Sequence, residues 1–192
     1  MKITKYDTVE NKISFADPTI FLAGPTVRGN QTHLKSWRRD AEAEFLKQGF
    51  DGQLIAPEFP DRFASDQKRY DLPVWEFYGL KCSHCILFWI PRTRELIGLT
   101  TNHEIGYWMA RHRDKVIYGR PKDAYRMEYL DIMWVQDSKD RMGRADKCPI
   151  YSKLEDTVSA AIQKAKYNFD FVFNCSQPEA GQKGLNLPEK RD

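Results

Sequence analysis

The sequence has no long hydrophobic run. Its longest apolar stretch, Cys85 to Ile90, is far too short to span a bilayer, so we expect no membrane partner. The amino terminus, residues 1–15, has neither a continuous apolar core nor a small-residue cleavage site, which argues against a signal peptide. We therefore expect a cytoplasmic protein with reduced thiols.

An excess of charge of either sign is also absent. The 192 residues include 30 basic and 27 acidic side chains, a net charge of +3. Because basic and acidic residues are almost equal in number, we expect no polymeric nucleic acid as a partner. The length suits one domain with a sizeable core, which we expect over residues 1–173. Residues 174–192 are rich in Pro, Gly, Gln and Lys, and we expect them to form a polar, mobile tail.

Several signature motifs are missing. No G-x-G-x-x-G follows the first predicted strand, which argues against a Rossmann dinucleotide site. The chain also lacks a Walker A sequence and the G-x-S-x-G elbow of serine hydrolases.

Cysteine is scarce, with four residues in the chain. Cys82 and Cys85 have C-x-x-C spacing, but this pair ends a helix and enters a strand, the reverse of a thioredoxin-like redox motif. A zinc site would need a second ligand pair, and Cys148 and Cys175 are isolated from each other. We expect neither a metal nor a cofactor, and a buried cysteine at the strand entry.

Strand and helix signals alternate along the chain. Predicted strands cover residues 19–24, 54–56, 85–90 and 115–118, and predicted helices cover 32–48, 73–80, 102–111 and 154–166. Residues 129–135 fit either a further strand or a short helix. This alternation predicts an α/β fold in which helices cover both faces of a mainly parallel, five-stranded sheet.

Glu104 lies where open α/β sheets bind ligands, at a predicted helix start beyond the carboxyl end of a strand. The helix dipole would keep this carboxylate ionised, ready to act as a nucleophile or base. A structural interpretation competes with this one. Thr101 and Glu104 match the S/T-x-x-E capping box, in which the Glu only caps the helix.

Other polar residues follow the predicted strands. They are Gly24-Pro25-Thr26 after the first strand, Glu58 after the second, and Arg92 and Arg94 after the third, with Glu76 on the helix before the third strand. A region rich in carboxylates suits chemistry on a sugar. Retaining glycosyl transfer needs one carboxylate as nucleophile and a second acidic group beside the leaving group.

Three segments together resemble the nucleoside 2-deoxyribosyltransferase family, in particular its divergent bacterial and phage-like branch. The first segment runs from Ile20 to Thr26 and continues through Ser36-Trp-Arg38 and residues 49–52. The second is Pro57-Glu58. The third runs from Trp75-Glu76 to Ile90-Pro91 and on through residues 99–106. The resemblance covers roughly residues 18–120.

The resemblance implies a flavodoxin-like three-layer α/β sandwich that forms homo-oligomers. It implies transfer of 2-deoxyribose between nucleobases through a covalent glycosyl-enzyme, with a nucleoside or nucleotide as substrate. Glu104 matches the nucleophile, and Glu76 matches the acidic residue that handles the nucleobase. The predicted substrate-binding residues are Gly24, Pro25, Thr26, Glu58, Asn102 and Gly106.

Two alternatives remain open. The same residues could form a nucleoside or nucleotide N-glycoside hydrolase, with Arg28, Arg92 or Arg94 binding a phosphate. The domain could also be a non-catalytic nucleotide sensor, because a fold does not fix a function. Two departures from the family pattern bear on the choice. His84 stands where many relatives have an acidic residue, and the carboxyl-terminal tail has no motif that matches theirs.

Overall fold

The computed structural model describes residues 1–5, 16–27, 31, 33–58, 66–143 and 148–176. The strands are β1 (Lys2–Thr4), β2 (Thr19–Ala23), β3 (Gln53–Ile55), β4 (Cys85–Trp89) and β5 (Val116–Gly119). The helices are α1 (Trp37–Lys47), α2 (Asp66–Cys82), α3 (Leu99–Arg111), α4 (Glu128–Met142) and α5 (Leu154–Ser176), with a 3-10 turn, η1 (Arg113–Lys115), before β5.

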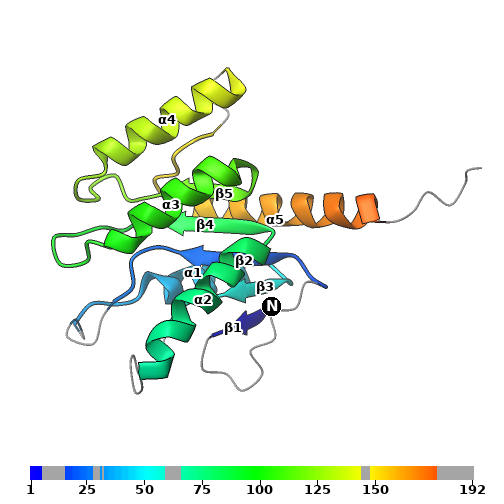
Figure 1. Cartoon of the computed structure of the whole chain (residues 1–192), viewed down its shortest axis with the longest axis horizontal. Helices are drawn as coiled ribbons and strands as arrows, with labels where there is room; N and C mark the ends of the chain where they lie inside the picture. The colour runs from blue at the N-terminus through cyan, green and yellow to red at the C-terminus, as the bar shows by residue number, and fades with distance from the viewer. Residues whose placement is uncertain (6–15, 28–30, 32, 59–65, 144–147, 177–192) are drawn as a thin grey trace, which may run out of the picture.

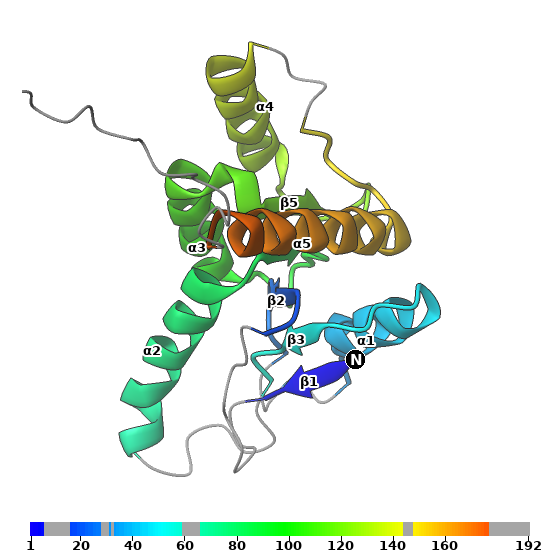
Figure 2. The same cartoon turned by 90° about the vertical axis from the view of Figure 1, so that its right-hand side faces the viewer.

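The strands form one sheet in the order β1-β3-β2-β4-β5, and all neighbouring strands in it pair in parallel (Figure 1). Helices α1 and α5 pack on one face, and α2, α3 and α4 contribute to the core on the other. Figure 2 shows α1 and α2 on opposite sides of the strands. The predicted α/β class and the flavodoxin-like three-layer arrangement are therefore confirmed.

Strands β2 and β4 are buried along their whole length, as expected for parallel strands covered on both faces. They lie side by side at the centre of the sheet, with Phe21 opposite Ile86. The chain leaves β2 through α1 on one face and leaves β4 through α3 on the other face. The carboxyl ends of β2 and β4 therefore form the topological switch point at which open α/β sheets bind ligands.

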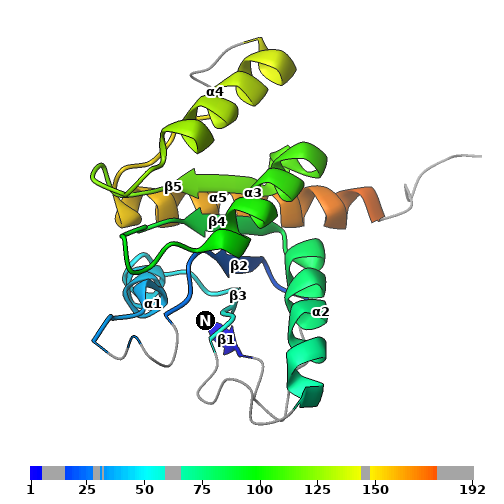
Figure 3. The same ribbon diagram turned by 60° about the vertical axis from the view of Figure 1, so that its left-hand side comes forward.

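The fifth strand is not the one that an apolar run would suggest. Residues 129–135 belong to helix α4, and the strand that completes the sheet is β1. In α4, Trp134 and Ser138 are buried one turn apart, whereas Tyr129 is 78% exposed. Only one helical face is therefore covered, and α4 extends from the β5 edge of the sheet (Figure 3).

Each of the four predicted helices differs from its expected bounds. Helix α1 begins at Trp37 and not at residue 32. Helix α2 begins at Asp66 and contains Pro73, which was expected to open it. Helix α3 begins at Leu99, after the left-handed residue Gly98 (φ +63°). Helix α5 continues to Ser176, beyond its predicted end at residue 166 and past residue 174, where the tail was expected to begin. Residues 177–192 lie outside the described part.

The earlier start of α3 changes the interpretation of Glu104. With Leu99 as the first helical residue, Glu104 lies in the second turn, and Gly98 is the N-cap residue without any side-chain hydrogen bond. The capping-box interpretation of Thr101 and Glu104 is therefore wrong.

Among the described helices, none has the length and apolarity needed to cross a membrane.

Candidate active site

Gly24 ends β2 in a conformation that only glycine adopts readily, with φ +152°. A Cβ atom there would lie 2.2 Å from the carbonyl oxygen of Trp89 and 2.8 Å from the Trp37 ring. The absence of a side chain thus lets the end of β2 approach the end of β4. The chain then turns through Pro25, whose carbonyl oxygen accepts a hydrogen bond from the Trp37 indole at 2.9 Å.

Arg38 lies beneath this turn and is only 1% exposed. Its guanidinium donates hydrogen bonds to the carbonyl oxygens of Leu22 (3.0 Å) and Gly24 (2.9 Å) and to the Thr26 hydroxyl (3.2 Å). A buried guanidinium therefore holds the β2–α1 turn, residues 24–26, and brings a positive charge to the carboxyl end of β2.

Glu76 lies on α2, which packs closely on the sheet. A Cβ atom at Gly79 would lie 2.8 Å from the Phe21 ring, so glycine permits the close approach of the helix to β2. The next residue, Phe77, packs its ring against Trp108 of α3 at 5.8 Å between centroids. This contact fixes α2 against α3 one turn away from Glu104.

The carboxylates of Glu76 and Glu104 interact across these two helices. Burial raises the pKa of Glu104 to about 7, and the negative charge of Glu76 adds to the rise, while Arg38 opposes it. Burial also raises the pKa of Glu76, again opposed by Arg38. The expectation that the helix dipole keeps Glu104 ionised is wrong, because burial and a second carboxylate outweigh a dipole that acts mainly in the first turn.

Neither carboxylate is used to hold the fold together. Within the described ranges, the side chains of Glu76 and Glu104 make no hydrogen bond or ion pair. Structural carboxylates in protein interiors are normally paired, so these two half-buried carboxylates are the candidate functional groups of this site. We refer to Glu76, Glu104 and Arg38 as the carboxylate site.

Glu58 follows β3 but is engaged in the structure. Its carboxylate accepts a hydrogen bond from the Ser36 hydroxyl. Ser36 is the N-cap of α1, and its hydroxyl oxygen accepts from the Arg38 backbone N–H at 3.2 Å. Glu58 thus supports the first turn of the helix that carries Arg38. Its predicted contact with substrate stays a prediction.

Asn102 and Gly106 are close to Glu104 in sequence but lie on the other side of helix α3. Each is two residues away, which is roughly 200° around an α-helix. The Asn102 side-chain oxygen accepts a hydrogen bond from Arg92 at 2.5 Å, and a Cβ atom at Gly106 would meet no other atom within 4 Å. The structure brings Gly24, Pro25 and Thr26 to the carboxylate site through Arg38, but turns Asn102 away from Glu104.

Both cysteines of the C-x-x-C pair, Cys82 and Cys85, are free thiols. Cys85 is fully buried at the start of β4, and burial raises its thiol pKa far above the usual range. This finding agrees with the predicted buried cysteine at the strand entry. In the described part of the chain, no three His, Cys, Asp or Glu residues are grouped so as to hold a metal ion.

Arginines considered for phosphate binding are placed differently. Arg92 is 6% exposed and donates to Asn102 and, at 3.4 Å, to the carbonyl oxygen of Arg126. Arg94 is exposed, with its guanidinium 5.5 Å from the centroid of the Tyr125 ring. Arg28 lies outside the described residues.

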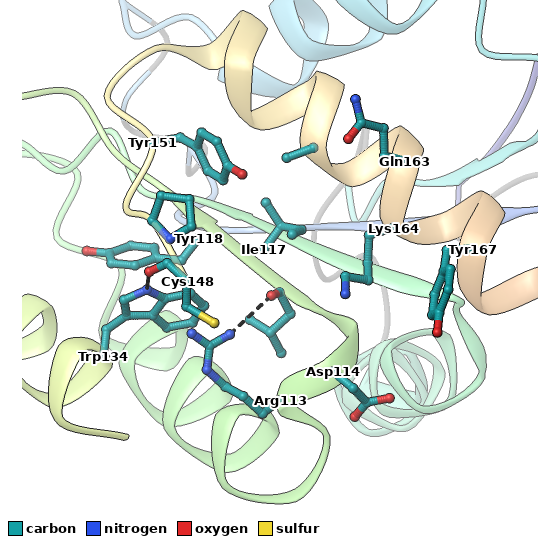
Figure 4. Close-up of a pocket in the computed structure, with 13 residues that line it drawn as sticks. Arg113, Asp114, Ile117, Tyr118, Trp134, Cys148, Tyr151, Gln163, Lys164 and Tyr167 are labelled. Carbon is teal, nitrogen blue, oxygen red and sulfur yellow. Dashed lines mark hydrogen bonds between the residues drawn. The ribbon is translucent and has the colours of Figure 1, made fainter. Parts of the chain in front are cut away.

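A cavity of about 340 Å³ lies elsewhere, beside β5 and α5 (Figure 4). Arg113, Tyr118, Trp134, Tyr151 and Lys164 are among its lining residues, and neither Glu76 nor Glu104 is. Its main cation is already engaged, because Arg113 pairs with Asp137 at 3.2 Å and stacks over Trp134. We therefore place the candidate chemistry at the unpaired carboxylates and not in this cavity.

The importance of Arg38 is not evident from the motif search. A usable signal was present, since Arg38, Ala41 and Phe45 follow helical spacing and all three are buried. A charged residue in an apolar stripe indicates a buried partner.

A comparison of the chain with models of known protein families and with curated proteins finds no match.

Proposed function

We propose that the carboxylate site transfers 2-deoxyribose between nucleobases through a covalent intermediate on Glu104. The observation that carries the proposal is the position of Glu76 and Glu104, two half-buried carboxylates on different helices at the switch point of the sheet, neither of which has a hydrogen-bond or ion-pair partner among the described residues. The family resemblance supplies the substrate class, a deoxynucleoside or its nucleotide together with an acceptor nucleobase.

Bond cleavage at the anomeric carbon creates an oxocarbenium-like sugar. In the proposed mechanism, the Glu104 carboxylate attacks this carbon from the face opposite the base. Glu76 delivers a proton to the departing base, directly or through water. A second base then takes the sugar from Glu104 as these steps reverse, so the configuration at the anomeric carbon is retained.

The electrostatics of the pair suit these roles. Like charges in close proximity cannot both ionise easily, so the pair loses its protons in separate steps. Between these steps it carries one proton and one negative charge. This form contains an acid for the leaving base and an anion for the sugar within a single site.

The test uses purified protein with deoxyadenosine, in the presence and absence of a second nucleobase such as cytosine. Formation of deoxycytidine would support the proposal. Release of adenine and free deoxyribose with no exchange would instead indicate a hydrolase, and binding without turnover would indicate a sensor. Either of these last two results would overturn the transferase assignment.

Mass spectrometry identifies the nucleophile independently. Protein quenched during turnover should carry a deoxyribosyl adduct on the peptide that contains Glu104. We also expect deoxynucleosides to react much faster than ribonucleosides, because the resemblance is to enzymes that act on deoxyribose. An adduct on another peptide would reassign the nucleophile.

The resemblance further leads us to propose a homo-oligomer. Apolar side chains on α2 beside Glu76 are exposed, including Val74 (55%) and Tyr78 (54%). Sedimentation equilibrium would measure the assembly, and a monomer at micromolar concentration would contradict this part of the proposal.

A further inference from the structure

A cavity separate from the carboxylate site lies between β5, α4 and α5, and we call it the β5 cavity (Figure 4). Its volume of about 340 Å³ falls within the usual range of small-molecule sites, roughly 300 to 1,000 Å³. Residues 116–118 of β5 line it. In the described part of the chain, the outer edge of β5 carries a single bridge, between Gly119 and Tyr151, so the cavity lies along an edge that no further strand covers.

The floor of the β5 cavity is formed by buried side chains that are already hydrogen-bonded. Tyr118 and Trp134 pack with their ring centroids 5.1 Å apart. The Tyr118 hydroxyl donates to Asp131 at 2.8 Å, and the Trp134 indole N–H donates to the Cys148 carbonyl oxygen at 2.9 Å. The Arg113 guanidinium is likewise bonded to acceptors of the protein. These side chains therefore shape the cavity, and a ligand must find its polar partners on the other walls.

Two accessible walls of the cavity differ in chemical character. Ile117 and Tyr151 are half-buried and form an apolar wall that includes an aromatic ring. Gln163, Lys164 and Tyr167 come from α5 and form the other wall (Figure 4). The cavity thus presents an apolar, partly aromatic surface on one side and a cation with a neighbouring amide on the other.

Lys164 supplies the positive charge of the α5 wall. It is half-buried, its Nζ atom lies 5.9 Å from the centroid of the Tyr167 ring, and within the described ranges no carboxylate is in ion-pair distance of it. Lys166, on the same helix, instead pairs with Asp51 at 3.8 Å. The side chain of Gln163 makes no hydrogen bond to any described residue. The donors of Lys164 and Gln163 are therefore open to an anion.

We propose that the β5 cavity binds a small planar aromatic monocarboxylate. The ring lies against Ile117 and Tyr151, and the carboxylate accepts hydrogen bonds from Lys164 and Gln163. A single ammonium group matches a single negative charge. The exposed Asp114 carboxylate also lines the cavity and repels a second negative charge, so an aromatic phosphate ester fits less well.

Three probes with the same ring and different head groups test this proposal: 2-naphthoate, 2-naphthamide and 2-naphthyl phosphate. Isothermal titration calorimetry of the full chain at neutral pH should give a dissociation constant of about 0.1 to 1 mM for 2-naphthoate, as expected for a ligand of this size. The uncharged amide should bind about tenfold more weakly, and the phosphate should also bind more weakly. No measurable binding of 2-naphthoate, or tighter binding of the phosphate, would overturn the proposal.

Variants of α5 test the cation and the space separately. Lys164→Gln should weaken 2-naphthoate about tenfold and leave 2-naphthamide unchanged, whereas the matched control Lys166→Gln should alter neither. Ala160→Leu places a larger side chain in the cavity, keeps a good helix former, and should weaken both probes about tenfold or more. Circular dichroism checks each fold, and Ala160→Leu serves if Lys164→Gln does not fold. Equal effects of Lys164→Gln and Lys166→Gln, or full binding by Ala160→Leu, would remove the probe from this cavity.

NMR then locates the bound probe. With 2-naphthoate, the backbone amide signals of Ile117 and Tyr151 should shift, and those of Gly24 and Glu104 should not. The opposite pattern would place the probe at the carboxylate site and overturn the proposal. Binding in the β5 cavity is independent of the proposed transferase reaction, because neither Glu76 nor Glu104 lines it. Base exchange can therefore fail while 2-naphthoate still binds, and the reverse result is equally distinct.

Discussion

Burial raises the pKa of Glu104, and the negative charge of Glu76 adds to this rise although the two residues belong to different helices. Aromatic packing of Phe77 on Trp108 holds these helices together near both carboxylates. The pair makes no stabilising contact in the described part of the chain, so its maintenance costs stability.

Replacement of Glu104 by Gln should abolish base exchange while the fold remains intact. An amide cannot form the glycosyl-enzyme, so the rate should fall by about 10³-fold or more. Glu95→Gln is the matched control, because Glu95 is an exposed carboxylate bonded to His33 at 2.8 Å. Steady-state assays of both variants test this prediction. Near-normal turnover by Glu104→Gln would remove the residue from the mechanism.

Stability should depend on pH through Glu104. Its folded-state pKa of about 7 exceeds the ordinary value of 4.5, so the folded protein holds this proton more tightly than the unfolded chain. Stability is therefore lost as pH rises from 4.5 through 7. The full shift corresponds to ~3 kcal/mol, and partial exposure reduces the expected cost to ~2 kcal/mol.

Urea unfolding at pH 5 and pH 8 measures this dependence. Glu104→Gln should gain stability over wild type at pH 8 and gain much less at pH 5. An equal difference at both values would mean that Glu104 titrates normally in the folded protein.

Gly24 and Gly106 should respond oppositely to alanine. In Gly24→Ala, the new Cβ atom meets the Trp89 carbonyl oxygen at 2.2 Å in a backbone conformation with φ +152°, so we expect a loss of ~3 kcal/mol or more. In Gly106→Ala, the Cβ atom meets nothing, so the higher helix propensity of alanine should add up to ~1 kcal/mol. Thermal unfolding compares the two.

Activity then adds information about Gly106. If Gly106→Ala is more stable but slower, the residue approaches the substrate as the resemblance implies. If it is more stable and equally fast, Gly106 has no close contact with substrate.

His84 should stabilise the protein only in its neutral form. Its Nδ1 atom accepts the Thr19 backbone N–H at 3.1 Å, and burial, assisted by Lys115, lowers its pKa. The stabilisation is present above pH 6.5 and declines as pH falls below that value, because protonation removes the acceptor. His84→Ala should therefore cost ~1 to 2 kcal/mol at pH 8 and less at pH 5. Chemical unfolding at both pH values provides the test, and a cost independent of pH would contradict it.

The central strands could be predicted because their sequences are unambiguous. Apolar runs that end at Gly24-Pro25 and at Pro91 correspond closely to β2 and β4. The placement of polar residues after these strands also led to the region around Gly24 and Glu104. Parallel strands present their carboxyl ends at one edge of the sheet, so a local pattern was sufficient.

Other features depend on contacts that a local pattern does not contain. The strand β1 has only the residues Lys2–Thr4 and exists because β3 provides a neighbour. Residues 129–135 are apolar enough for a strand, yet the β5 edge is occupied by a single bridge between Gly119 and Tyr151. The helical spacing of Arg38 with Ala41 and Phe45 indicates that Arg38 is buried, but its acceptors, 14 to 16 residues earlier in the chain, are identified only in the folded structure.

The location of Glu76 on α2 and Glu104 on α3 also makes proton binding sensitive to the distance between two helices. If α2 and α3 move apart, the repulsion between the two carboxylates weakens and the pKa of Glu104 falls. At neutral pH the pair then releases a proton. Thermodynamic linkage requires the reverse as well, so acidification favours the closer arrangement. A ligand that separates or bridges these helices should therefore exchange protons with the solvent, and its heat of binding should vary with the ionisation enthalpy of the buffer.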